Sequence, residues 1–175
     1  MKQMKKHLLQ GDNLKQDKHH HFLKKVMTLI SLLFIVYQIW SVTFSTIDPM
    51  HQMSIHLVFI LMLSFGLYRS IPLIDSVFLI LATSSGIYFS IHAERFATRI
   101  VGIDPLSTWD LFFGLILVVL SIEAARRTIG TPIIIIALLF LTYALFGDRL
   151  SGIWYHRGMS LTELLEQLAF SYNGL

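Results

Sequence analysis

Five long apolar segments, separated by short polar ones, make up most of the chain after residue 25. A helix of 19 residues rises about 28 Å, which is close to the thickness of a bilayer's hydrocarbon core. No water is present there to satisfy backbone groups, so helices are the plausible spanning form. The sequence predicts an all-α, polytopic membrane protein with about five transmembrane helices, at approximately residues 26–44, 50–68, 72–91, 107–122 and 131–146.

Composition supports this class. Hydrophobic residues are 54% of the chain and charged residues 14%, whereas about a quarter of a typical soluble domain is charged. Cysteine is absent, which excludes disulfides and thiolate metal sites. The first apolar segment is too long for a signal peptide and is not followed by a cleavage site, so we expect it to be retained.

Lysine and arginine predict the orientation. All seven lysines precede residue 26. With the N-terminus in the cytoplasm, the inner segments carry ten cationic residues, namely these lysines with Arg69, Arg126 and Arg127. The outer segments carry four, namely Arg95, Arg99, Arg149 and Arg157. The positive-inside rule therefore predicts a cytoplasmic N-terminus and a periplasmic or outer C-terminus. We expect the membrane to be the inner membrane of a bacterial or archaeal cell.

The same pattern divides the chain into three parts. Residues 1–21 are polar and predict a disordered cytoplasmic tail. Residues 22–127 contain four predicted spans. Residues 128–175 contain a fifth span, an outer loop and a short amphipathic helix.

A charged group separates the fourth and fifth spans. Glu123 lies three and four residues before Arg126 and Arg127, so its carboxylate can pair with either arginine on one helical face. We expect these residues to form the cytoplasmic turn of a hairpin, since burying all three in lipid would cost several kcal/mol. The main interpretation is an anchor that sets orientation, and the alternative is a contact surface for another subunit or domain.

Two carboxylates lie near predicted helix starts. Asp75 and Asp110 fall where the helix dipole favours an anion, and Ser107 forms a capping pair with Asp110. Capping is the main interpretation of both carboxylates, and an ion ligand is the alternative. Thr131 and Pro132 similarly predict a cap residue and a first-turn proline for the fifth span.

Small residues recur at four-residue spacing in the third span. Ala82, Gly86 and Ser90 predict close packing of another helix. An unwound substrate site of the kind found in transporters is the alternative, although one glycine without proline is weak evidence for a break.

The histidines predict no built metal or haem site. His19, His20 and His21 are adjacent in the polar tail, which suits only adventitious metal binding. His56 and His92 are expected at different membrane depths, which disfavours axial ligation of one haem. No phosphate loop, nucleophile elbow or metalloprotease motif is present, so the sequence predicts no enzyme activity and no cofactor in this chain.

The C-terminal segment predicts a short amphipathic helix. Ser160 and Glu163 match a capping box. A leucine stripe follows at helical spacing, with Glu163 and Glu166 away from it; its members are Leu161, Leu164, Leu165 and Leu168. The acidic polar face suits anionic lipid poorly, so docking on protein is favoured over lying on the outer membrane surface.

Specific strings resemble a known family. IEAARRTIG before an apolar run, then LTYALFGDRL, HRGMSLTELLEQL and SYNGL, together resemble the N-terminal region of fused permeases of tripartite ATP-independent periplasmic (TRAP) transporters. The four-helix/twelve-helix fusion type associated with TAXI binding proteins is the most similar. YRSIPLIDSVFLILATSSGIY and DPLSTWDL fit the same region. The resemblance covers about residues 22–175, and its most specific part is Glu123 to Gly130 with the later HRG string.

The resemblance implies secondary transport of organic acids. In that family a periplasmic binding protein delivers the substrate, a twelve-helix permease moves it with an elevator-like motion coupled to sodium, and a four-helix part acts as scaffold. Residues 22–127 would be this small permease part and the fifth span the connector. The chain ends where the large domain should begin, so we expect a fragment or one half of a split fusion that does not transport alone.

No substrate or sodium site is carried over, because these belong to the large domain. Two alternatives stay open at this stage. The chain is otherwise an anchor subunit of another inner-membrane complex of respiratory type, or a non-functional remnant.

Overall fold

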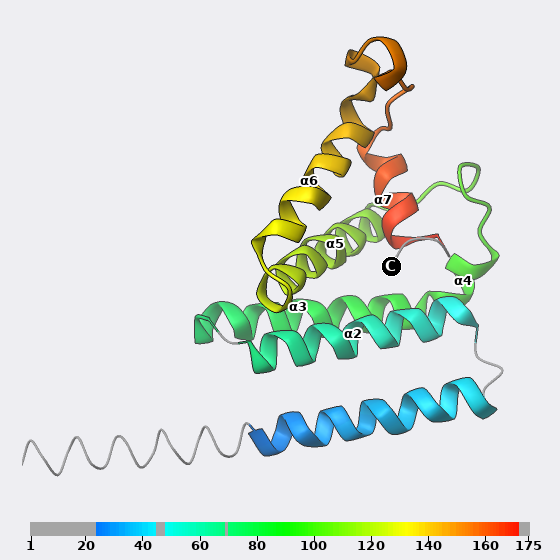
Figure 1. The fold of residues 1–175 in the computed structure, drawn as a ribbon. Coiled ribbons are helices and arrows are strands. Elements are labelled where there is room, and N and C mark those ends of the chain that lie inside the picture. The colour runs from blue at the N-terminus through cyan, green and yellow to red at the C-terminus, as the bar shows by residue number, and fades with distance from the viewer. Residues whose placement is uncertain (1–23, 45–47, 69, 172–175) are drawn as a thin grey trace, which may run out of the picture.

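The computed structural model describes residues 24–44, 48–68 and 70–171, and every regular element in these residues is helical (Figure 1). This confirms the predicted all-α class for the described residues. The predicted disordered tail, residues 1–21, lies outside them. An N-terminal helix (Lys24–Phe44) is followed by α2 (Pro49–Leu67), α3 (Pro72–Ile91), α4 (Ala93–Thr98), α5 (Thr108–Thr128), α6 (Thr131–Phe146), the 3-10 turns η1 (Gly147–Arg149) and η2 (Gly152–Trp154), and α7 (Leu161–Ala169).

Five of these helices are long and apolar enough to cross a membrane. They are Lys24–Phe44, Pro49–Leu67, Pro72–Ile91, Thr108–Thr128 and Thr131–Arg149, the last including the turn η1. The number of candidate spans agrees with the prediction. Helix α4 was not predicted, because its six residues are too few to show a period.

Local capping explains several helix starts. The Asp48 carboxylate accepts the Met50 N–H at 2.8 Å, and Pro49 follows as the first helical residue of α2. At α5, Ser107 and Asp110 form the predicted capping box in both directions. The predicted cap of α6 is wrong: Gly130 is the N-cap, with φ of 113°, and Thr131 is already helical. A glycine suits this position because L-residues rarely adopt that φ.

The predicted end of the fourth span is also wrong. Helix α5 continues to Thr128, so Glu123, Arg126 and Arg127 belong to its last turns instead of forming the hairpin turn. Pairing of the carboxylate with both arginines at helical spacing supports this extension. The turn itself consists of Ile129 and Gly130.

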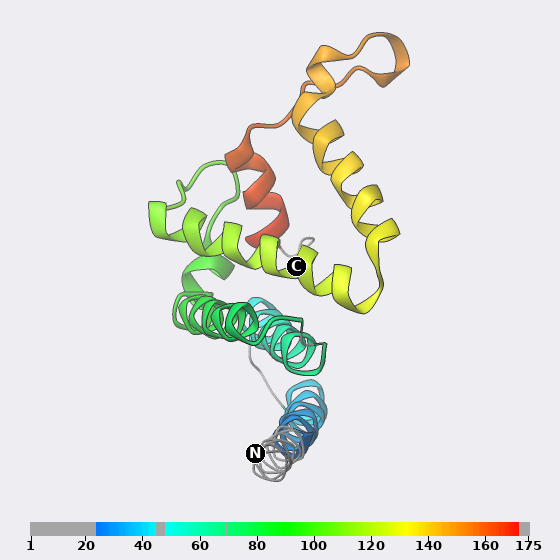
Figure 2. The same cartoon turned by 90° about the vertical axis from the view of Figure 1, so that its left-hand side faces the viewer.

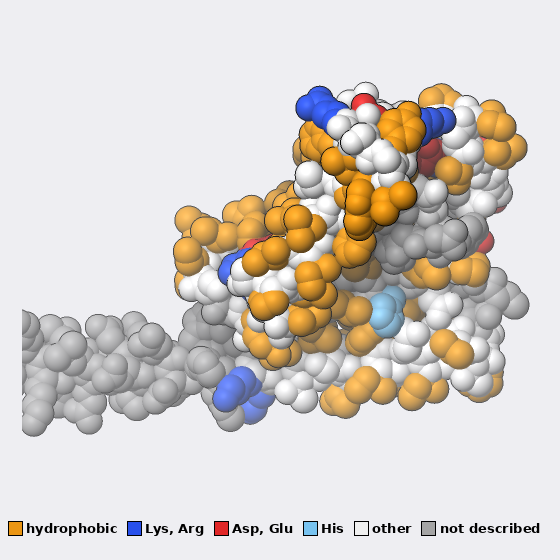
Figure 3. Space-filling model, turned by 45° about the horizontal axis from the view of Figure 1, so that its top comes forward, with side chains coloured by type: hydrophobic (Ala, Val, Ile, Leu, Met, Phe, Trp, Pro, Cys, Tyr) orange, Lys and Arg blue, Asp and Glu red, His pale blue; other side chains and the backbone are white. Residues whose placement is uncertain are grey.

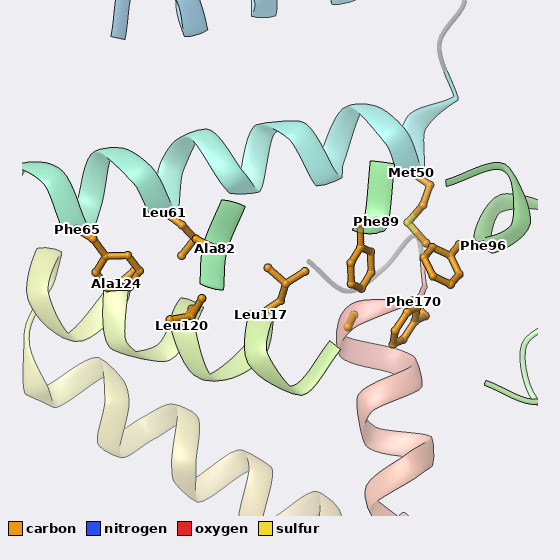
Figure 4. Close-up of a cluster of buried hydrophobic side chains, with 11 residues drawn as sticks. Met50, Leu61, Phe65, Ala82, Phe89, Phe96, Leu117, Leu120, Ala124 and Phe170 are labelled. Carbon is orange, nitrogen blue, oxygen red and sulfur yellow. The ribbon is translucent and has the colours of Figure 1, made fainter. Parts of the chain in front are cut away.

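Helices α2, α3 and α5 form the central bundle (Figures 1 and 2). Helix α3 returns beside α2, and α5 packs on both. Leu61 and Phe65 of α2 point toward α5, with Ala82 of α3 close by (Figure 4). The buried hydrophobic cluster consists of Met50, Leu61, Phe65, Ala82, Phe89, Phe96, Leu117, Leu120, Ala124, Ala169 and Phe170.

The N-terminal helix packs on α2 through aromatic rings. The Phe34 ring lies 5.0 Å from the His56 ring and 5.1 Å from the Phe59 ring, measured between centroids. The other faces of this helix are largely exposed.

Helix α6 diverges from the central bundle after Gly130. In Figure 2, α5, α6 and α7 form three sides of a triangle, with the 147–160 loop at the far end of α6. Ile134 is the one buried residue of α6. Hydrophobic side chains are therefore exposed along this helix, as the orange atoms in Figure 3 show.

The packing of Gly86 against Val58 gives a test of the contact between α2 and α3. A Cβ atom at Gly86 would overlap the Val58 side chain, so we expect Gly86→Val to force the helices apart. Overpacking of this kind costs about 1–3 kcal/mol of unfolding free energy. Unfolding of the purified protein by SDS titration in mixed micelles would measure this loss.

The matched control is Ser76→Val, which adds bulk at an exposed position of the same helix. We expect it to change the unfolding free energy by less than about 0.5 kcal/mol. Equal effects of the two substitutions would show that the α2–α3 contact does not depend on Gly86.

Candidate functional site: arginine–carboxylate clusters at the two ends of the bundle

The first cluster lies where α3 begins and α5 ends, and we call it the Asp75 cluster (Asp75, Glu123, Arg126 and Arg127). Asp75 is fully buried. Its Oδ1 accepts a hydrogen bond from Arg127 Nη1 at 2.5 Å, and its Oδ2 accepts the Ser70 N–H at 2.8 Å. The first turn of α3 is thereby fixed to the last turn of α5.

Arg127 makes two further hydrogen bonds within the chain. Its Nε donates to Glu123 at 2.7 Å, and Nη1 also donates to the Tyr68 carbonyl at 3.1 Å. The guanidinium lies 5.2 Å from the Phe65 ring centroid and 5.4 Å from that of Phe78. Removing one partner from a buried charge pair leaves the other charge unsatisfied, which costs several kcal/mol, so this network holds α2, α3 and α5 together.

Glu123 contacts both arginines, as its spacing predicted. Arg126 Nε and Nη2 donate to the two Glu123 carboxylate oxygens at 2.7 and 2.8 Å. The two arginines nevertheless differ, because the Arg127 side chain is 6% exposed and that of Arg126 is 48% exposed. Only Arg126 and the edge of Glu123 are thus accessible to another subunit, and the predicted interface role stays a prediction.

The second cluster lies at the opposite ends of α3 and α5, and we call it the Asp110 cluster (Tyr88, Arg95, Ser107 and Asp110). Asp110 is fully buried. Its Oδ1 accepts the Tyr88 hydroxyl at 2.6 Å and its Oδ2 accepts the Ser107 N–H at 2.7 Å. Arg95 binds both carboxylate oxygens, and this hydrogen bonding raises the pKa of its guanidinium. One carboxylate therefore caps α5 and ties it to α3 and α4.

A third ion pair docks α7 on the α4–α5 connection. Arg99 Nη2 lies 2.5 Å from Glu166 Oε1, and the Gly102 N–H donates to the same oxygen at 3.2 Å. Glu166, expected on the polar face away from the leucine stripe, is buried, because Arg99 meets it from the connection. Leu161, expected in the apolar stripe, is exposed instead.

Aromatic packing completes the docking of α7. The Phe170 ring lies 5.0 Å from the rings of both Phe89 and Phe96, measured between centroids, and it covers Gly114 of α5. The predicted capping box of Ser160 and Glu163 is confirmed. The Ser160 N–H donates to the Glu163 carboxylate at 2.7 Å, and this hydrogen bond lowers the pKa of Glu163.

The predicted packing residues of α3 have two kinds of surroundings. Ala82 lies in the buried hydrophobic cluster. Gly86, which faces Val58 of α2, and Ser90 both line an apolar cavity of about 260 Å³ between α2 and α3. Helix α3 is continuous through all three residues, so the structure has no unwound segment at this point.

The two histidines considered as haem ligands each have a hydrogen-bond partner within the chain. His56 Nδ1 lies 2.9 Å from Gln38 Oε1, and His92 Nδ1 lies 2.9 Å from the Tyr88 carbonyl oxygen. His19, His20 and His21 lie outside the described residues. Within residues 24–44, 48–68 and 70–171, no group of three or more His, Asp or Glu side chains is arranged to hold a metal ion.

Sequence reasoning assigned capping to Asp75 and Asp110 but missed their arginine partners. For Asp75 the predicted capping role is also wrong, because α3 has no side-chain cap and this carboxylate accepts from the Ser70 N–H and from Arg127. A signal was available for the first pair, because Asp75 and Arg127 have opposite charge and lie at the ends of predicted helices on the same side. The sequence gives no such signal for the Arg99–Glu166 pair, because it does not predict how the segments that carry these two residues are oriented relative to each other.

Comparisons with protein-family models, curated proteins and solved structures give no match.

The Asp110 cluster generates a test by isosteric substitution. Asp110→Asn keeps the size of the side chain but removes the charge that Arg95 and Tyr88 bind. We expect it to lower the unfolding free energy by about 2–3 kcal/mol, as for hydrogen bonds to charged groups. Unfolding by SDS titration would measure this change.

Glu94→Gln is the matched control, because Glu94 is exposed in the neighbouring helix α4. We expect it to change the unfolding free energy by less than about 0.5 kcal/mol. A loss at Asp110 no greater than that at Glu94 would contradict the assigned role of the cluster.

Proposed function

We propose that this chain is a membrane-embedded scaffold that forms the small-permease portion of a TRAP-type transporter for organic acids. It would act with a large twelve-helix permease domain or subunit, which carries the substrate and sodium sites, and with a periplasmic TAXI-type binding protein. Its resemblance to the N-terminal region of fused TRAP permeases supplies the family, and the surface and the charge pairing of the structure support the role.

The main support for the proposal is that charged groups are paired inside the bundle and apolar groups are exposed on its surface. The fully buried carboxylates pair with arginines inside the bundle, whereas large apolar side chains are exposed along all five long helices. Leu73, Val42 and Phe140 are each about 70% or more exposed. A soluble monomer rarely exposes apolar patches of this extent, but a lipid-facing surface is expected to do so.

Rigidity supports a scaffold role over a conducting one. The Asp75 and Asp110 clusters fix both ends of α3 against α5. The cavity between α2 and α3 is apolar and offers no polar path for an organic anion. A partner that moves by an elevator motion needs a fixed element to move against, and the clamped bundle has this property.

Helix α6 and the neighbouring end of α5 suit a partner contact. Ile134 is the only buried residue of α6, so most of its surface is available to another helix. Arg126 and Glu123 lie beside its start and form an ion pair in which Arg126 is half exposed. We assign this region, Glu123 and Arg126 with the start of α6, to the contact with the large permease.

Co-purification tests this assignment. We expect the tagged chain, produced together with the large TRAP permease of the same organism, to retain that permease in mild detergent. Arg126→Glu places a second carboxylate beside Glu123 and should lower the amount of recovered permease at least fivefold. Mass spectrometry and quantitative immunoblotting would identify and measure it.

Arg157→Glu is the control, because this exposed arginine lies far from the assigned region along the chain. It should leave recovery unchanged. If the unmodified chain retained no large permease, the TRAP assignment would fail. A Soret absorption band in the purified chain would instead favour an anchor subunit of a respiratory-type complex.

A further inference from the structure

The loop between α6 and α7 is built around His156. The Gly158 N–H donates to His156 Nδ1 at 2.9 Å, so Nδ1 is the acceptor and the ring proton lies on Nε2. Nε2 in turn donates to the Tyr143 carbonyl oxygen at 2.8 Å. One imidazole therefore joins the last turn of α6 to the returning chain.

Further contacts hold the loop in one shape. The Tyr143 hydroxyl donates to the Trp154 carbonyl at 3.1 Å, and the Met159 N–H donates to the Ala144 carbonyl at 2.9 Å. The His156 ring packs on Gly147, where a Cβ atom would overlap it. Because its backbone groups are bonded to α6, the loop presents its side chains from a fixed frame.

The side chains that this frame exposes are large and apolar. Ile153 is 92% exposed, and Trp154 and Tyr155 are each more than 60% exposed, although all three directly precede His156 in the loop. A hollow of about 290 Å³, lined by Ile136, Leu139, Phe140, Tyr143 and Trp154, joins Trp154 to the apolar surface of α6. An ordered loop with an exposed apolar tip indicates a binding surface.

We propose that this loop anchors the outer end of α6 in the membrane interface, with Ile153, Trp154 and Tyr155 inserted at the boundary between headgroups and acyl chains. The inference rests on the proposed membrane-spanning role. Trp and Tyr are enriched at this level of a bilayer. The loop directly follows the apolar helix Thr131–Arg149, and its apolar tip continues the exposed surface of that helix.

Two arginines near the apolar tip also suit a loop at the membrane interface. Arg149 ends the apolar helix and its guanidinium lies 4.9 Å from the Phe146 ring centroid, while the Arg157 side chain is largely exposed. Arginines at helix ends extend toward headgroups in this way. The loop lies at the free end of α6, away from the central bundle (Figures 1 and 2), so the rest of the described chain does not cover it.

Depth-dependent fluorescence quenching tests the anchor. The double substitution Trp40→Phe and Trp109→Phe leaves Trp154 as the single tryptophan. In phosphatidylcholine vesicles, we expect lipids brominated near the headgroup to quench Trp154 at least twofold more than lipids brominated near the chain end. Aqueous iodide should quench it weakly. In the His156→Ala background, loosening of the loop should reduce the contrast between shallow and deep bromines.

A second variant separates this inference from the proposed function. With Trp109→Phe and Trp154→Phe, the remaining Trp40 reports on the N-terminal helix. Bromolipid quenching of Trp40 but not of Trp154, with Trp154 open to iodide, would overturn the anchor and leave membrane spanning intact. Shielding of Trp154 from both quenchers would indicate a protein contact and would also overturn it. If His156→Ala left the contrast between shallow and deep bromines unchanged, the role of His156 in ordering the loop would be overturned. If bromolipids quenched neither tryptophan, membrane spanning itself would be contradicted.

Discussion

Arginine–carboxylate pairing at the two ends of α5 determines how the helices fit together. Asp75 binds Arg127 at one end, and Asp110 binds Arg95 at the other. Apolar side chains pack against many neighbours with similar energy, and in lipid they supply little net driving force for helix association. A buried carboxylate is different, because a shift of one helical turn would leave it without its cation. The Asp75–Arg127 pair at one end and the hydrogen bond from the Tyr88 hydroxyl to Asp110 at the other therefore specify the register of α3 against α5, while Arg95 joins α4 to the same carboxylate.

Most of the fold could be predicted from local sequence patterns, and the pairings could not. Apolar runs and capping residues such as Ser107 and Asp110 act over a few neighbouring residues, so they define spans and helix starts directly. The partner of Asp75 lies at the far end of another helix, and Glu166 is buried only because Arg99 reaches it from a connection without regular structure. Charged residues after an apolar run predict that the span ends, but here they pair within the helix and with α3, so α5 extends beyond Ile122.

The same arrangement fits the supporting role that we propose for this chain. The clamped bundle of α2, α3 and α5 uses its buried charges internally, and this leaves the N-terminal helix and α6 with apolar surfaces that face outward. Gly130 directs α6 away from the bundle, and α7 returns to close the opposite end through the Arg99–Glu166 pair. A rigid centre with an extended arm suits a scaffold in the membrane, which is the role we propose.

From the proposed membrane-spanning role we infer that the Asp75 and Asp110 clusters lie at opposite faces of a bilayer. Because the chain has no cysteine, single substitutions can report on each face. Ile103→Cys lies beside the Asp110 cluster and Ile129→Cys beside the Asp75 cluster, and both positions are exposed. In intact spheroplasts, a membrane-impermeant maleimide should label Ile103→Cys at once and Ile129→Cys only after permeabilisation. Equal labelling of both positions before permeabilisation would contradict the account.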